Sequence, residues 1–170
     1  MWRQQGSPHW LGLGGDFDLD FYTELLADEK WDPPAPAWGS EWFPGFGAVL
    51  HSGWPGPRET YMVYHQGDVA TAHYDDDQGS FEMWGKGRPL SLDFGYVGYD
   101  AAWHHNRMDI GNAGKIQAFS SAPGADYFHG RQNGGWDRQV VFMKDTDPLG
   151  PTYFVRRDST TGTGNANWWL

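Results

Sequence analysis

The alternation of hydrophobic and polar positions is clearest in one segment, which predicts a β-hairpin. Residues 80–86 alternate apolar and polar side chains, and residues 88–94 do so again. A period of two residues is typical of a strand with one buried face. Gly85 and Gly87 are expected to supply the turn. Antiparallel pairing would then bring the start of the first strand and the end of the second to the same end of the hairpin.

Short strands are predicted along most of the remaining chain, between clusters of turn residues. Two precede the hairpin and five follow it: residues 46–51, 60–65, 105–110, 115–120, 126–131, 138–144 and 152–157. The last residues, NANWWL, look like a strand that begins where the chain stops. Short strands at regular spacing, separated by Gly, Pro and Asn turns, are typical of a sandwich or barrel. We predict an all-β fold, an antiparallel β-sandwich.

The one convincing helical pattern lies near the N-terminus. Residues 19–30 repeat apolar side chains at helical spacing and predict a short helix. The segment DPPAP, residues 32–36, follows it and predicts an extended connector. We therefore divide the chain into an irregular segment with this helix and connector, residues 1–42, and a β-sandwich, residues 43–170.

Composition and charge limit the ligands and partners that the chain can have. The 170 residues contain no cysteine, so any metal must be held by His, Asp, Glu or backbone oxygen. A net charge of −10 argues against nucleic acid as a partner. The sequence has no apolar run of about 18 residues that would span a membrane, and its start lacks the pattern of a signal peptide. The 11 Trp residues suit either a sandwich core or stacking on sugar rings.

Acidic side chains gather at one end of the predicted hairpin. His73, Asp75, Asp76 and Asp77 precede its first strand, and Asp93 ends its second strand. If the strands pair, these groups meet where a cation could bind. The alternative is a solvated turn, because Asp is common in exposed loops. We expect Asp76 to be solvated and Asp77 to serve as a turn or supporting residue.

A histidine pair, His104 and His105, is the next source of metal ligands. Strand alternation would place the two side chains on opposite faces, and we expect His105 to face the acidic end. Two aspartates and one histidine form a reasonable ligand set for zinc or another divalent ion, with a position left for water. A hydrogen-bonded structural histidine is the alternative.

A series of motifs in this order resembles a known family. The run HYDDDQGSFEMWGKGRPLSLDFG is followed by HHNRM, DRQVVFMKD and TYFVRRDS. Together, over residues 43–169, they resemble the C-terminal β-sandwich domain of heparinase II/III-like polysaccharide lyases. The family pattern has a His-x-His-x-Asp cluster before GSF, a strand that ends in Asp-x-Gly, and an HN pair.

The resemblance implies a metal site. Asp75 falls on the second His of the family cluster, Asp93 on the strand-end Asp, and His105 on the His of HN. In the family these three positions bind a divalent metal, usually zinc. Because Asp75 replaces a histidine, the site is more anionic here and shifts toward harder ions such as Mn²⁺ or Ca²⁺. Zinc remains the first expectation.

The resemblance also implies a reaction, β-elimination on a uronic acid. This chemistry needs neutralisation of the carboxylate, a base at C5 and an acid at O4. His73 falls on the family's substrate-facing His, and Tyr96 or Tyr99 is expected to supply a phenol. Because the chain is acidic, arginines would have to create a local positive field: those at positions 88, 107, 131 and 138.

The family's active site lies between this kind of sandwich and an α/α toroid, which has no counterpart in these residues. We therefore expect a fragment that is truncated at its C-terminus and needs a toroid for full lyase activity. Its exposed sheet edges favour a homo-oligomer, and the family is secreted or periplasmic. Two alternatives are a non-catalytic carbohydrate-binding module, which stacks Trp and Tyr on sugars, and a small metalloenzyme that acts on glycans by itself.

Overall fold

In a computed structural model of the chain, the described residues are 39–53, 58–67, 76–93, 102–147, 149–162 and 165–169. These residues form two antiparallel sheets and contain no α-helix. The predicted helix over residues 19–30 and the connector after it lie outside the described residues. None of the helical structure in the described part is long and apolar enough to cross a membrane.

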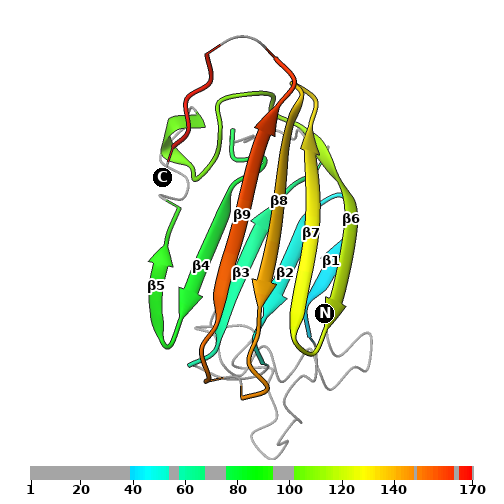
Figure 1. Ribbon diagram of the computed structural model, residues 1–170. Helices are drawn as coiled ribbons and strands as arrows, with labels where there is room; N and C mark the ends of the chain where they lie inside the picture. Colours follow the sequence, from blue (N-terminus) through cyan, green and yellow to red (C-terminus); the bar gives the residue numbers. More distant parts are fainter. Residues whose placement is uncertain are drawn as a thin grey trace, which may run out of the picture. The chain divides into compact units, whose positions relative to one another are not determined.

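The first sheet is a five-stranded antiparallel meander (Figure 1). Its strands follow one another in the order of the sequence: β1 (Glu41–Phe43), β2 (Gly47–His51), β3 (Thr60–His65), β4 (Phe81–Gly85) and β5 (Arg88–Ser91). The pairing of β4 with β5 is the hairpin that alternation predicted. It therefore brings the start of β4 and the end of β5 together, as expected.

The second sheet has four longer strands, also joined in sequence order. They are β6 (Gly114–Ala122), β7 (Ala125–Gln132), β8 (Trp136–Met143) and β9 (Tyr153–Thr160). A short 3₁₀ turn, η1 (Ala102–His104), lies in the connection from the first sheet to the second. The predicted all-β sandwich is confirmed.

The turn of the β4–β5 hairpin differs slightly from its prediction. The two residues at its tip are Lys86 and Gly87, both with positive φ, 56° and 82°. A two-residue turn with positive φ at both positions matches the right-handed twist of the flanking strands. Gly85, which was expected in the turn, is the last residue of β4.

The strand predicted over residues 105–110 is wrong. This segment forms bends with a single bridge, between Met108 and Trp168. Arg107 explains the difference, because it is fully buried within its own loop. Its guanidinium donates hydrogen bonds to the carbonyl oxygens of Met108 and Gly111, so the backbone curls around the side chain. The predicted terminal strand is reduced to the bridge at Trp168.

The core lies between the two sheets and comes from alternate residues of each. On β7, for example, every second residue is buried, and the same alternation holds on β8 from Arg138 onward, as the period of a strand requires. The rings of Tyr64, on β3, and Phe128, on β7, stack across the interface with centroids 4.2 Å apart. The fully buried members are mostly aliphatic or aromatic: Ala48, Leu50, Met62, Tyr64, Phe81, Ile116, Phe128, Val140 and Phe142. The sandwich is thus closed by apolar contact between the sheets.

One buried cation interrupts this apolar core. Arg138, on β8, is 1% exposed and forms a two-pronged ion pair with Asp158 on β9, at 2.8 Å from Nε and 3.2 Å from Nη2. Its Nη1 donates to the carbonyl oxygens of Gly79, at 2.6 Å, and Asn106, at 2.9 Å. The guanidinium also lies over the ring of Trp136, 4.7 Å from its centroid. Arg138 therefore joins the second sheet to two loops of the first.

We expect Arg138→Ala to lower the free energy of unfolding by about 3–5 kcal/mol, because it removes a buried ion pair with Asp158 and leaves the carbonyl oxygens of Gly79 and Asn106 without their donor. Urea unfolding followed by tryptophan fluorescence measures the change. Arg157→Ala, on the exposed face of β9, is the matched control and should stay within about 0.5 kcal/mol of the unaltered protein. Equal stability of the two variants would contradict a central role for Arg138.

Candidate functional site

Pairing of β3 with β4 continues past the strand ends and places a histidine at the acidic end of the hairpin. The His65 N–H donates to the Ser80 carbonyl at 3.0 Å, and the Gly79 N–H donates to the His65 carbonyl at 2.7 Å. Gly79 has a φ of 88°, a conformation that glycine adopts without strain. The turn brings the Asp77 carboxylate to His65, with 2.6 Å between Oδ2 and Nδ1.

A second histidine and aspartate meet beside this turn. His105 is 2% exposed, and its Nδ1 lies 2.6 Å from Oδ2 of Asp93. The next residue, Asn106, holds the loop in place. Its side-chain amide donates to the carbonyl oxygens of Phe81, at 3.1 Å, and Leu92, at 3.2 Å. These bonds connect the loop to the start of β4 and to the chain just after β5, next to Asp93.

The contact of His105 with the acidic end was predicted, and it is present. This contact does not arise from strand alternation, because residues 105–110 form a loop. The hydrogen bonds of Asn106 hold this loop, and with it the His105 ring, next to Asp93. His104 lies against Trp103, with ring centroids 3.6 Å apart. The other predicted site residues, His73, Asp75, Tyr96 and Tyr99, lie outside the described residues.

The Asp93–His105 pair suits a divalent metal chemically. A carboxylate oxygen and an imidazole nitrogen are ligands that zinc accepts. Their 2.6 Å separation is a hydrogen-bond distance, so Asp93 also orients the ring, as carboxylates behind metal-binding histidines do. Within the described part of the chain, no three His, Asp or Glu side chains are arranged to hold a metal. The assignment of Asp75, Asp93 and His105 as ligands therefore stays a prediction.

Two expectations about charged side chains need correction. Asp76 is not a solvated bystander, because its carboxylate forms an ion pair with the buried guanidinium of Arg107. Arg107 and Arg138 cannot offer a positive field to a substrate, since both are fully buried and bonded to the protein. Arg131 is exposed but pairs with Asp137. Asp77 was expected to be a turn or supporting residue, and its carboxylate does form a hydrogen bond with His65.

The electrostatics at this end favour positive charge. The hydrogen bond that His65 donates to the Asp77 carboxylate raises the pKa of His65 above its ordinary value of 6.5, against the lowering effect of partial burial. The charges of Asp93 and Glu82 raise it further. Partial burial and the charge of Asp93 likewise raise the pKa of the Glu82 carboxyl. A cation, or a protonated histidine, is therefore stabilised among these carboxylates.

Sequence reasoning missed His65 and Glu82 as members of the site. A signal was present, because both lie on strands that were predicted next to each other, and His65 is the last residue of its strand. Pairing of these strands puts Val63 opposite Glu82 and carries His65 to the loop before β4. The register, which depends on the geometry of the connection as well as on alternation, brings His65 to Asp77.

Comparison with solved structures identifies the fold. The chain superposes on the crystal structure of heparan sulfate lyase HepC from Pedobacter heparinus with a TM-score of 0.63 and 17% identity. The match covers 94% of this chain and 29% of that one. A heparinase III structure, the BT4657 gene product, matches with a TM-score of 0.63 and 19% identity over 92% of this chain and 27% of that one.

The chain thus spans less than a third of these proteins, and at such identities the likeness establishes the fold alone. The predicted resemblance to heparinase II/III-like lyases is confirmed at that level. No protein-family model matches the sequence, and no curated protein matches it.

We expect His65 to titrate above pH 6.5 in the metal-free protein, because Asp77 stabilises its protonated form. NMR of the imidazole protons, assigned with His65→Gln, measures this. Asp77→Asn should lower the His65 pKa, whereas Asp145→Asn, in the distant β8–β9 loop, should leave it unchanged. The raised pKa implies a contribution to stability that is fully present below pH 6.5 and is lost as the pH rises through the folded-state pKa. Titration at or below pH 6.5 would contradict the pairing.

Proposed function

We propose that this chain is the metal-holding β-sandwich part of a polysaccharide lyase that acts by β-elimination on uronic-acid-containing glycans. The observation that carries the proposal is the contact of the buried His105 with Asp93 at the end of the β4–β5 hairpin. Both residues occupy positions that the family resemblance assigns to the metal. The fold similarity to heparan sulfate lyase structures supports the same class.

The proposed reaction breaks the bond between C4 and O4 of a uronic acid. A base removes the proton from C5, the electron pair forms the C4–C5 double bond, and an acid protonates the departing O4. We assign one proton-transfer role to His73 and the other to the phenol of Tyr96 or Tyr99. A divalent metal, zinc first and Mn²⁺ or Ca²⁺ as alternatives, would be held by Asp75, Asp93 and His105. When bound, it would supply positive charge and fix the loop that presents His73.

The described residues support this assignment by fixing the chain on both sides of His73 and Asp75. On one side, the Gly67 N–H donates to the side-chain oxygen of Gln78 at 2.5 Å. On the other side, Asp76 is paired with the buried Arg107. Residues between two anchored points lose less conformational entropy when they adopt one geometry. Such anchoring would help to position a metal ligand and a proton-transfer group.

The chain matches less than a third of the lyases it resembles, so its substrate and partners belong to the proposal. A toroid domain would bring the remaining catalytic groups. A polymeric glycan is the proposed substrate, and a location outside the cytoplasm, where such polymers occur, is part of the same proposal. Self-association through the sheet edges, proposed from the sequence, is retained.

A second candidate, a non-catalytic carbohydrate-binding module, is favoured by an aromatic pair. Tyr61, on β3, and Trp84, on β4, are cross-strand neighbours on the outward face of the first sheet. Their rings are nearly parallel, at 6°, with centroids 6.4 Å apart. Aromatic rings on the outward face of a sheet suit stacking against a sugar ring.

The metal assignment predicts that purified chain, without added metal, retains a divalent ion. Asp93→Ala and His105→Ala should each lower metal affinity by about 10- to 100-fold, because each removes a ligand or the group that orients one. Elemental analysis after dialysis measures bound metal, and circular dichroism checks folding. Asp145→Ala, in the β8–β9 loop, is the control and should keep its metal. Unchanged metal content in both site variants would exclude the site.

The lyase assignment predicts an unsaturated product. Incubation of the chain with heparan sulfate or alginate should raise ultraviolet absorbance, slowly compared with a complete lyase because the toroid groups are missing. His73→Ala should lower that rate by about 10²- to 10⁴-fold. Binding without unsaturation would instead identify a carbohydrate-binding module, and reducing ends without unsaturation would identify a hydrolytic metalloenzyme.

A further inference from the structure

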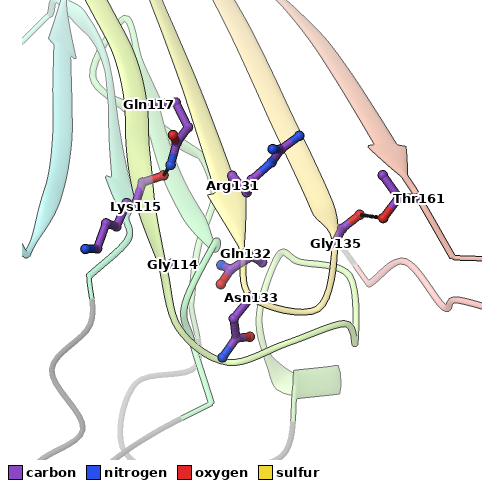
Figure 2. A pocket seen from close by; sticks show the side chains of 8 residues that line it. All are labelled: Gly114, Lys115, Gln117, Arg131, Gln132, Asn133, Gly135 and Thr161. Atoms are coloured by element: carbon purple, nitrogen blue, oxygen red, sulfur yellow. Dashed lines mark hydrogen bonds between the residues drawn. The ribbon is translucent and has the colours of Figure 1, made fainter.

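A shallow pocket of about 430 Å³ lies at one end of the second sheet, and its lining includes neither Asp93 nor His105. Figure 2 shows side chains from the ends of β6 and β7 around it, with Gly135 and Thr161 on the opposite side. Lys115 and Arg131 are paired across β6 and β7 and are the charged residues of its lining. None of the residues that line it, all of them described, carries a carboxylate. In a chain with a net charge of −10, this is an unusual local composition.

Both cations have capacity for a ligand. Lys115 is exposed, and its ammonium group forms no ion pair with the described residues. Arg131 is 55% exposed and donates to Asp137 through Nε, at 2.8 Å, and Nη2, at 2.9 Å. This pairing orients the guanidinium, while Nη1 donates no hydrogen bond within the described part of the chain. The two side chains start from paired positions on β6 and β7, and in Figure 2 their charged groups extend in different directions, so each can meet an anion from its own side. Guanidinium and ammonium groups are both suitable receptors for a carboxylate or sulfate.

Neutral polar groups complete the lining. Side-chain amides come from Gln117 and Asn133, and a hydroxyl comes from Thr161. Gln132 also lines the pocket but is only 2% exposed, and neither atom of its side-chain amide has a hydrogen-bond partner among the described residues. A buried amide without partners is unfavourable, and such groups in proteins usually bind water or a ligand. Because the Gln132 amide lies against Gly79 and the buried ring of Trp136, the polar groups open to a ligand are those of Gln117, Asn133 and Thr161.

Two hydrogen bonds connect the strands of this pocket to the segment that follows His65. The Gly114 N–H donates to the Gly67 carbonyl at 3.0 Å, and the side-chain amide of Gln66 donates to the Arg131 carbonyl at 3.1 Å. The pocket and the candidate site thus lie at the same end of the sandwich, one on each sheet.

We propose that this pocket is a second subsite for an acidic glycan, in which Lys115 and Arg131 bind a carboxylate or a sulfate ester. The choice of a glycan rests on the proposed function, whereas recognition of the anionic group rests on the pocket itself. The amides and the hydroxyl would bind sugar hydroxyl groups next to the anion. The subsite would retain the polymer while another of its residues occupies the site near Asp93.

The test is an NMR titration of the full ¹⁵N-labelled chain with four probes. These are an unsulfated uronate tetrasaccharide, a sulfated heparin-derived tetrasaccharide, neutral cellotetraose and inorganic sulfate. Both acidic oligosaccharides should shift the backbone amides of Lys115, Gln117, Asn133 and Thr161, and cellotetraose should not. The acidic oligosaccharide that binds more tightly identifies whether the pocket prefers a carboxylate or a sulfate ester. Binding of inorganic sulfate as tight as that of the sulfated oligosaccharide would overturn the glycan part of the proposal.

Lys115→Glu should weaken oligosaccharide binding at least tenfold, because it reverses a charge in the pocket. Its fold should be intact, since this side chain bonds to none of the described residues. Arg88→Glu, on the exposed β5 strand, reverses an equivalent charge outside the pocket and should change affinity less than twofold. Unaltered binding by Lys115→Glu, shifts confined to residues near Asp93, or no binding at millimolar probe would each overturn the subsite.

The proposed lyase function and the proposed subsite can be tested independently of each other. Asp93→Ala should keep the shifts at Lys115 and Asn133 while it loses metal. Oligosaccharide binding in this pocket by a chain that forms no unsaturated product would reject the elimination reaction and keep the subsite.

Discussion

The buried guanidinium of Arg138 is the constraint on which this end of the sandwich depends. A charge removed from water must be paired and must have its hydrogen bonds satisfied. Here Asp158 supplies the opposite charge, and the carbonyl oxygens of Gly79 and Asn106 accept the remaining bonds. Gly79 lies in the turn that brings Asp77 to His65, and Asn106 follows His105. One side chain from the second sheet therefore holds both halves of the candidate site on the first.

Arg107 extends the same principle to the loop before β6. Its guanidinium is fully buried, pairs with Asp76 and binds carbonyl oxygens of its own loop. Two internal arginines thus order loops in a chain that has no disulfide. The consequence for function is that neither cation is available to a ligand. Exposed positive charge lies instead on the outer side of β6 and β7, at Lys115 and Arg131, where we propose that an acidic glycan binds.

The two regions for which we propose a function differ in charge. Carboxylates surround His65 and His105, which suits a metal or a proton carried by histidine. Cations and amides line the pocket on the other sheet, which suits an anion. A polymer of uronic acids presents carboxylates at regular intervals along its length. The separation of acidic and basic regions at one end of the sandwich is therefore compatible with metal-assisted positioning in one place and retention of the polymer in another.

The sequence by itself determined the all-β class, most of the strands and the hairpin, because alternation with period two directly reports which side chains face a core. The motif order also identified Asp93 and His105 as residues that meet. Tertiary structure decided the rest. Arg107 turned a predicted strand into a loop, Asp76 became its ion-pair partner, and register brought His65 to Asp77. These outcomes depend on how buried polar groups find partners far apart in sequence, and local patterns carry no information about that pairing.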